Sequence, residues 1–241
     1  MRFAFYDFDG TLASGNVVQR YAYFARREPS RLRAAARYAR LLLNVPLFLA
    51  LDFFSRRLFN QVFFMEYRGL REDWLRNLQD SIFEKVIRPT IYPRAQALVR
   101  SDRTQGFTPV LVTGELDFVM APVIRYFAFD GAIVNSMTFR QGRATGVVVP
   151  PLIAEREKVE AIKRYSAKHG ASLAACKAYS DSFSDRHMLE SVGNPVAVNP
   201  DRRLMRVASD RGWPILDLRG DGPDPEGVFP TVSGRSDHGD S

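Results

Sequence analysis

The chain has 241 residues, 46% of them hydrophobic, which is enough for one large globular domain with a sizeable core. Its one cysteine, Cys176, excludes an internal disulfide and is typical of a reducing, cytoplasmic setting. The net charge of +7 is concentrated in residues 20–40, where seven arginines accompany a single acid, Glu28. An anionic partner is therefore expected: a phosphate substrate, an acidic membrane or a nucleic acid.

The N-terminal part begins with a predicted buried strand over residues 2–6, and no signal peptide is expected ahead of it. From there to about residue 90, apolar residues recur at helical spacing and strand patterns are rare. Pro29-Ser30 and Tyr67-Arg68-Gly69 are the predicted breaks between the helices of this block.

The remaining chain alternates predicted strands with predicted helices. A hairpin is expected over residues 131–149, where polar and apolar residues alternate around a Gln-Gly turn. The other predicted elements are strands at 109–113, 176–181, 195–200 and 213–218, and helices at 115–128 and 155–170. Gly, Pro, Asp and Ser dominate residues 219–241, which are predicted to form a disordered tail.

This order of elements predicts an α/β fold with a Rossmann-like parallel sheet. The helical block interrupts the alternation just after the first strand, so we expect it to be an inserted helical cap. The predicted domains are a catalytic core formed by residues 1–14 and 91–218, and a cap formed by residues 15–90.

Candidate chemical groups follow the ends of three predicted strands. The carboxyl ends of parallel strands meet at one edge of a sheet, where ligands bind. The groups are Asp7, Asp9 and Gly10 after the first strand, Thr113 and Gly114 after the second, Asp181 and Asp185 after the third, and Lys158 in the helix before the third. Together they supply the parts needed to cut a phosphate monoester.

The four aspartates suit phosphoryl transfer assisted by a metal ion. Asp7 can attack phosphorus as the covalent nucleophile, and Asp9 can protonate the leaving oxygen and later activate water. Asp7 and Asp181, with the backbone carbonyl of Asp9, can hold Mg²⁺, a hard cation that prefers oxygen ligands. Asp185 can orient metal-bound water from outside the ligand set.

The other candidates are predicted to bind the phosphoryl oxygens. They offer the hydroxyl of Thr113, the backbone amides of Gly10 and Gly114, and the positive charge of Lys158, which offset the charge of a phosphate dianion. Lys163, further along the same predicted helix, is an alternative to Lys158.

The motifs "DFDGT", "LVTG", a lysine before the last catalytic strand and "YSDSFSD" occur in the order found in the haloacid dehalogenase superfamily, and the chain resembles its phosphoserine phosphatase-like branch. The resemblance covers residues 3–217 and implies a Mg²⁺-dependent phosphatase that forms an aspartyl-phosphate. Within the superfamily, Asp9 favours a phosphatase over a dehalogenase. Phe8 stands where the ATPase pumps have a lysine.

Two departures leave the substrate open. Phosphoserine phosphatases typically carry a glutamate shortly after the first motif, and "LASGNVVQRY" contains no acid. Arg94 replaces a glycine often found before the second motif. The layout of the cap, in which an arginine-rich helix precedes a Leu/Phe-rich one, is similar to that of bacterial phosphatidylglycerophosphate phosphatases.

The Leu/Phe-rich stretch Leu41–Phe54 has two interpretations. The favoured one is a cap helix buried against its neighbours, as are the cap phenylalanines. The alternative is a segment that lies on an anionic membrane surface. A transmembrane span is not expected, because the longest run without a strongly polar residue, Val45–Leu51, is far short of the roughly 20 residues required.

Three functions follow from these alternatives. The first is hydrolysis of a lipid phosphate such as phosphatidylglycerophosphate or lysophosphatidic acid, by a cytoplasmic enzyme with peripheral membrane contact through its basic cap. The second is hydrolysis of a small soluble phosphate similar to phosphoserine. The third is a non-catalytic module that binds membrane or nucleic acid, although no nucleic-acid motif accompanies the arginines and no nucleic-acid partner is expected.

Overall fold

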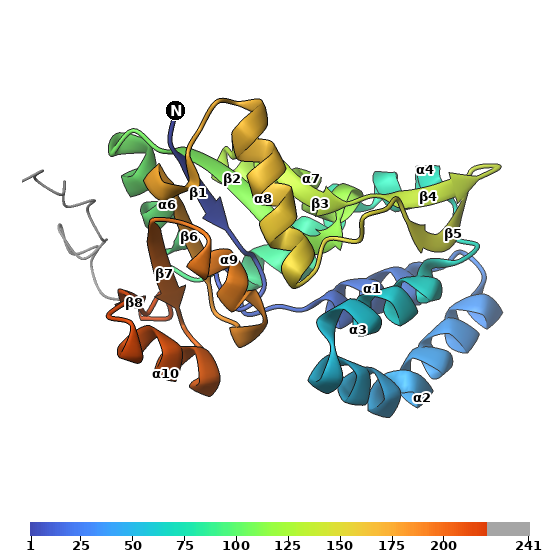
Figure 1. Cartoon of the computed structure of the whole chain (residues 1–241). Helices are drawn as coiled ribbons and strands as arrows, with labels where there is room; N and C mark the ends of the chain where they lie inside the picture. Colours follow the sequence, from blue (N-terminus) through green and yellow to red (C-terminus); the bar gives the residue numbers. More distant parts are fainter. Residues whose placement is uncertain (221–241) are drawn as a thin grey trace, which may run out of the picture.

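The computed structural model describes residues 1–220, so the predicted tail lies outside the described residues apart from its first two positions. Its centre is a parallel sheet of six strands in the order β3-β2-β1-β6-β7-β8 (Figure 1). The strands are β1 (Phe3–Tyr6), β2 (Thr108–Leu116), β3 (Gly131–Asn135), β6 (Lys177–Ser180), β7 (Asn194–Val198) and β8 (Ile215–Leu216). The predicted α/β class with a Rossmann-like sheet is confirmed.

Helices cover both faces of the sheet because strand side chains alternate between faces. Phe3 and Phe5 of β1 pack on one face with α8 (Arg156–Lys168), α9 (Arg186–Glu190) and α10 (Arg202–Asp210). Ala4 and Tyr6 point to the other face, toward α6 (Ala95–Thr104) and α7 (Asp117–Phe127). All four residues of β1 are buried, which explains its unbroken apolar sequence.

The strand order places β1 in the middle, between β2 and β6. The chain leaves β1 for β2 on one side and later reaches β6 on the other, and such a reversal opens a crevice at the carboxyl ends of the strands. The helical block lies beyond these ends (Figure 1).

The block between β1 and β2 is helical, with the two predicted breaks in place. Its elements are α1 (Val17–Arg27), α2 (Arg31–Phe54), α3 (Arg56–Phe64), η1 (Met65–Tyr67), α4 (Glu72–Asn77), α5 (Gln79–Ile82), η2 (Phe83–Ile87) and η3 (Arg88–Thr90). Ser30 caps α2 by accepting a hydrogen bond from the Arg33 amide, and Gly69 adopts a positive φ of 83°.

The predicted hairpin over residues 131–149 is wrong in its first part. Gly131–Asn135 is β3, an edge strand of the parallel sheet, and the hairpin consists only of β4 (Met137–Arg140) and β5 (Arg143–Val148). An edge strand and a hairpin share the same alternation of polar and apolar residues, so the pattern could not separate them. The hairpin also contacts the helical block of residues 15–90, which is called the cap below. The Gly69 amide donates to the Ala144 carbonyl, and the Ala144 amide donates to the Leu70 carbonyl.

The favoured interpretation of Leu41–Phe54 as a buried helix is also wrong. Only Leu41 and Phe48 of α2 are buried, while Phe53 and Phe54 are 85% and 80% exposed. The cap phenylalanines beyond α2, Phe59, Phe63 and Phe64, are buried as expected. Helical periodicity identifies an apolar face but not whether another element covers it.

Helix α2 is also longer than the sequence indicated, because Pro46 does not end it. Its 24 residues are long and apolar enough to cross a membrane by length and composition. Only 11% of its most apolar window is buried in the described part of the chain.

Candidate active site

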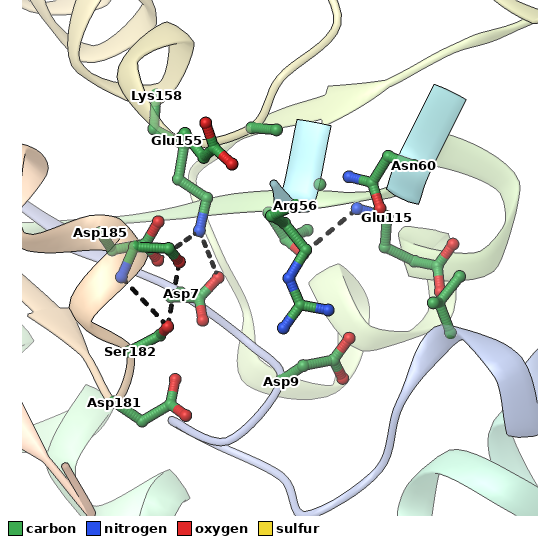
Figure 2. Close-up of a pocket in the computed structure, with 15 residues that line it drawn as sticks. Asp7, Asp9, Arg56, Asn60, Glu115, Glu155, Lys158, Asp181, Ser182 and Asp185 are labelled. Carbon is green, nitrogen blue, oxygen red and sulfur yellow. Dashed lines mark hydrogen bonds and ion pairs between the residues drawn. The ribbon is translucent and has the colours of Figure 1, made fainter. Parts of the chain in front are cut away.

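The predicted site residues meet in one cavity of about 110 Å³ at the carboxyl ends of β1, β2 and β6 (Figure 2). The cavity lies between the sheet and the cap, which contributes Val17, Arg56 and Asn60. Of the eight residues predicted for the site, seven line it: Asp7, Asp9, Thr113, Gly114, Lys158, Asp181 and Asp185.

Lys158 links two of the predicted aspartates. Its ammonium donates to Asp7 Oδ1 at 2.7 Å and to Asp185 Oδ2 at 2.6 Å, and all three side chains are buried (Figure 2). Asp185 also accepts a hydrogen bond from the Ser180 hydroxyl at 2.9 Å. Asp185 therefore holds Lys158 in place beside Asp7, which keeps a positive charge next to the predicted nucleophile. Lys163 forms an exposed ion pair with Glu160 instead, so it is not the phosphate-binding lysine.

Asp181 lies on the other side of Asp7. The Thr11 hydroxyl is within hydrogen-bonding distance of both, 3.3 Å from Asp7 Oδ2 and 3.1 Å from Asp181 Oδ1. Gly10, at a φ of 81°, packs against the Asp181 carboxylate, and a Cβ at this position would lie 2.0 Å from Asp181 Oδ2. Gly10 thus allows the loop after β1 to approach Asp181, and it does not line the cavity.

Burial and mutual repulsion make this acid pair unfavourable without a cation. Burial, chiefly, raises the pKa of Asp7 to about 6, against the opposing effect of Lys158. Burial and the charges of Asp7 and Asp185 raise the pKa of Asp181 to about 8. A divalent cation between the two carboxylates would offset both effects.

The donor set fits Mg²⁺, which prefers carboxylate, carbonyl and water oxygens. Within the described residues, no three side chains of His, Cys, Asp and Glu gather closely enough to hold a metal by themselves. Asp7 and Asp181 would therefore need further oxygen ligands, and the backbone carbonyl of Asp9 is the one predicted from the sequence.

This acid pair gives a prediction about stability and pH. In excess EDTA the thermal midpoint should fall as pH rises from 5 to 8. In the folded chain the carboxyls of Asp7 and Asp181 hold protons to higher pH than in the unfolded chain, so unfolding becomes more favourable as they ionise. Between pH 5 and 8 the raised pKa of Asp7, about 6, and that of Asp181, about 8, span four pH units in total, so the loss should be on the order of 5 kcal/mol.

Calorimetry with and without Mg²⁺ measures the effect. Mg²⁺ should reduce the decrease of the thermal midpoint between pH 5 and 8. In EDTA, the midpoint of Asp181→Asn should depend less on pH than that of the wild type, because one of the two ionising groups is gone. A midpoint that rises with pH across this range in EDTA would contradict the assignment of these carboxyls as a strained pair.

The phosphate-binding candidates of β2 lie opposite Asp7. Thr113 is buried, and its hydroxyl accepts a hydrogen bond from the Glu115 amide at 3.3 Å. A Cβ on Gly114 would lie 2.9 Å from the Asn60 side chain and 3.1 Å from the Ile153 carbonyl. Asn60 of the cap thus approaches the backbone at Gly114 closely, and any side chain there would require Asn60 and the Ile153 segment to shift.

Asp9 is not directed at Asp7 but pairs with an arginine of the cap. Arg20 forms a two-pronged ion pair with Asp9, and its Nη1 also donates to Glu115 Oε2 at 3.0 Å. Arg20 and Glu115 are fully buried. The arginine-rich stretch was interpreted as a surface for anionic partners, and for Arg20 that interpretation is wrong. Arg20 connects α1 to the ends of β1 and β2.

Removing the Arg20 charge should destabilise the fold. In Arg20→Met the Glu115 carboxylate, 2% exposed, would be left without its ion partner, a loss of about 3–5 kcal/mol in the free energy of unfolding. Urea denaturation measures it. The double variant Arg20→Met/Glu115→Gln should recover part of the loss because it removes the orphaned charge. Equal stability of the single and double variants would show that the pair is not the source of the loss.

Other lining residues had no signal in the sequence. They come from the cap, from β2 and from the segments before α8 and after β6: Arg56, Asn60, Glu115, Glu155, Ser182 and Ser184. Glu155, at a φ of 48°, accepts hydrogen bonds from the Ser55 hydroxyl at 3.0 Å and the Arg57 amide at 3.3 Å. Arg57 also pairs with Glu157. These contacts hold the start of α3 against the start of α8 and close one side of the cavity.

Comparisons with known proteins agree with this geometry. An "Inhibition of morphological differentiation protein" of Streptomyces azureus is 36% identical over 151 residues, 63% of this chain and 54% of that protein. A phosphoserine phosphatase of Mycobacterium tuberculosis is 32% identical over 156 residues, 65% of this chain and 50% of that protein. The chain spans about half the length of the curated relatives it matches.

Structural similarity extends over most of the chain. A Bordetella pertussis protein of unknown function superposes with a TM-score of 0.79 at 25% identity, covering 90% of this chain and 98% of that one. The family model for haloacid dehalogenase-like hydrolases matches residues 4–190, from the first buried strand to the helix after Asp185. The resemblance carried by the four motifs is thereby confirmed, and the chain belongs to the haloacid dehalogenase-like hydrolases.

Proposed function

We propose that the chain is a Mg²⁺-dependent phosphomonoesterase that works through an aspartyl-phosphate on Asp7. The observation that carries this is the group formed by the buried Asp7 and Lys158 and the half-buried Asp181 in one cavity. A module that only binds would have no use for two repelling carboxylates beside a fixed lysine. With a pKa of about 6, Asp7 is mainly ionised at neutral pH, as a nucleophile must be.

In the first step an Asp7 carboxylate oxygen attacks phosphorus, and the bond from phosphorus to the leaving oxygen breaks. Asp9 donates a proton to that oxygen, so the product leaves as an alcohol. For this, the Asp9 carboxyl must turn from Arg20 toward the leaving oxygen beside Asp7. Lys158 and the donors at Thr113 and Gly114 stabilise the charge on the transferring phosphoryl group.

In the second step water attacks phosphorus and the bond to Asp7 breaks. Asp9 accepts the proton of that water, inorganic phosphate forms, and Asp7 is regenerated. Asp7, Asp181 and the Asp9 carbonyl are the residues that would hold Mg²⁺, which supplies positive charge next to the phosphoryl oxygens. The contacts of Glu155 with the start of α3 hold the cap against the core beside the cavity in both steps.

Two substrate classes remain, and a specific observation supports each. The name of the Mycobacterium relative, phosphoserine phosphatase, favours a small soluble phosphate. The exposed apolar face of α2 favours a lipid phosphate such as lysophosphatidic acid or phosphatidylglycerophosphate. The absence of an acid in residues 12–21 speaks against an amine-bearing substrate such as phosphoserine. A cytoplasmic location stays a prediction.

Release of inorganic phosphate in the presence of Mg²⁺ tests the proposal. The panel would contain p-nitrophenyl phosphate, phosphoserine, sugar phosphates, nucleotides, lysophosphatidic acid and phosphatidylglycerophosphate. We expect hydrolysis of p-nitrophenyl phosphate and of at least one biological phosphate. No release from any of them, by folded protein with Mg²⁺, would contradict the proposed function.

A further inference from the structure

Helix α2 exposes one continuous apolar face. Its outward positions recur every three or four residues and carry no charge after Arg31: Leu32, Ala35, Ala36, Ala39, Leu42, Leu43, Pro46, Leu47, Leu49, Ala50, Phe53 and Phe54. At 100° per residue these positions span roughly 160° of the helix surface. Leu41 and Phe48, which face the cap, lie on the opposite side.

This face is a patch rather than a scatter of single residues. Ten of the fifteen large hydrophobic side chains exposed in residues 1–220 fall between Leu32 and Met65. They include Leu43 at 80% exposure, and the patch continues onto α3 through Leu58 and Val62. Figure 1 shows α2 as an outer helix of the cap, beyond α1 and α3. A patch of this extent on a folded protein indicates a binding surface.

We propose that this face of α2 docks the protein on the surface of an anionic lipid bilayer. The positive charge around the patch indicates that the partner is anionic. Residues 26–65 contain eight arginines and only two acids, Glu28 and Asp52, so this segment carries a charge of +6, against a net +7 for the chain. An apolar helix face bordered by arginines is the pattern of helices that lie in a membrane interface.

A second copy of the chain is the weaker alternative. Two copies joined through α2 would bring two segments of the same large positive charge together, with few acids to pair with. An anionic membrane provides both the apolar layer and the countercharge.

The contacts of α2 favour a helix that lies along the membrane rather than across it. Arg33 and Arg37 pair with Glu28, and Arg40 pairs with Glu66, so the inner side of the helix is tied to the cap. The rings of Phe59 and Phe63 pack against Phe48. A span would require these pairs to break and several arginines to enter the hydrocarbon layer, at about 2.5 kcal/mol or more each.

The patch ends beside the mouth of the active site. Phe53 and Phe54 line a groove of about 530 Å³ together with Arg57 and three arginines of the core. This groove shares Arg56, Glu155, Ser182 and Ser184 with the catalytic cavity. Figure 2 shows Arg56 above Asp9, between the cap and the acid pair.

The volumes then indicate the class of substrate, a step that rests on the proposed phosphatase function. The cavity, of about 110 Å³, is much smaller than the adjoining groove, of about 530 Å³. A leaving group too large for the cavity would extend into this groove, which is lined by more arginines than acids and by Phe53 and Phe54. Such a lining suits an amphiphilic phosphomonoester whose phosphate enters the cavity while its apolar part stays in the membrane.

Vesicle co-sedimentation of the full chain tests the proposal. The test variant is Leu43→Glu/Leu47→Glu, which alters two outward side chains of α2 that do not line the cavity or the groove. The matched control is Val147→Glu/Val149→Glu, which adds the same charge at two exposed valines of the hairpin region. The wild type should sediment with phosphatidylglycerol vesicles and much less with phosphatidylcholine vesicles.

The α2 variant should bind anionic vesicles about tenfold more weakly or worse, and the control should bind like the wild type. Both should hydrolyse p-nitrophenyl phosphate at the wild-type rate, whereas the α2 variant should lose activity on lysophosphatidic acid in vesicles. Wild-type protein that stays in the supernatant with anionic vesicles would overturn the proposal. So would an α2 variant that binds as the wild type does, or a wild-type dimer that the α2 variant converts to a monomer.

The two proposals fail in different ways. Hydrolysis of p-nitrophenyl phosphate without vesicle binding overturns the docking surface and leaves the phosphatase. Vesicle binding without hydrolysis of any phosphate supports the docking surface and overturns the phosphatase, and with it the amphiphilic substrate.

Discussion

Asp7→Asn should abolish phosphate release while the fold is retained. An amide cannot form the acyl-phosphate bond, and loss of a nucleophile typically lowers kcat by about a thousandfold or more. The side-chain carbonyl of the introduced amide can still accept the hydrogen bond of Lys158, and the change removes a buried charge whose pKa is already raised by burial. The thermal midpoint should therefore be unchanged or slightly higher.

Steady-state kinetics on p-nitrophenyl phosphate and a thermal melt measure both effects. Asp130→Asn is the matched control, because Asp130 forms an exposed ion pair with Arg103 far from the cavity. Activity of Asp7→Asn within about tenfold of the wild type would remove Asp7 from the nucleophile role. If Asp7→Asn does not fold, Asp7→Ser takes its place, because serine also lacks the carboxylate that would form the acyl-phosphate bond.

Removal of divalent metal should have an effect of similar size. Asp7, Asp181 and Asp185 bring three carboxylates to the cavity that a phosphate dianion would enter, and Lys158 supplies the only ammonium among the residues lining it. Without a cation the charge repulsion between carboxylates and phosphate opposes binding and attack. Excess EDTA should therefore stop phosphate release, and added Mg²⁺ should restore it.

Calcium is the informative control. Ca²⁺ binds oxygen ligands at longer distances and with looser geometry than Mg²⁺, so it should bind the acid pair without restoring the full rate. Dialysed enzyme would be assayed with each ion in turn. Full activity in excess EDTA would contradict the role of Asp7 and Asp181 as metal-binding residues.

Which residues gather at the candidate site was predictable from sequence, because most of them lie near element ends. Asp7 and Asp181 directly follow strands with a clear apolar pattern, Thr113 lies in the C-terminal half of β2, and parallel strands bring such positions together. The order of predicted strands and helices was enough to identify these residues, because the carboxyl ends of parallel strands meet at one edge of the sheet.

The cap was less predictable for physical reasons. The partners of Arg20 are Asp9 and Glu115, and the second of these is 95 residues away in the chain, so its burial could not be inferred locally. Arg56 and Asn60 reach the cavity only because α3 folds back over it, and no motif marks them. The apolar face of α2 was visible in the sequence, but its exposure depends on the absence of a covering element in the described part of the chain.

The most direct test of the account is a search for phosphorus on Asp7. The enzyme would be mixed with Mg²⁺ and p-nitrophenyl phosphate, quenched in acid within the first turnover, and digested for mass spectrometry. The account predicts a peptide containing Phe3–Ala13 that is one phosphoryl group heavier, with the modification on Asp7, and no such peptide from Asp7→Asn. Rapid phosphate release with no phosphorylated Asp7 at any quench time, or with the phosphoryl group on another residue, would contradict it.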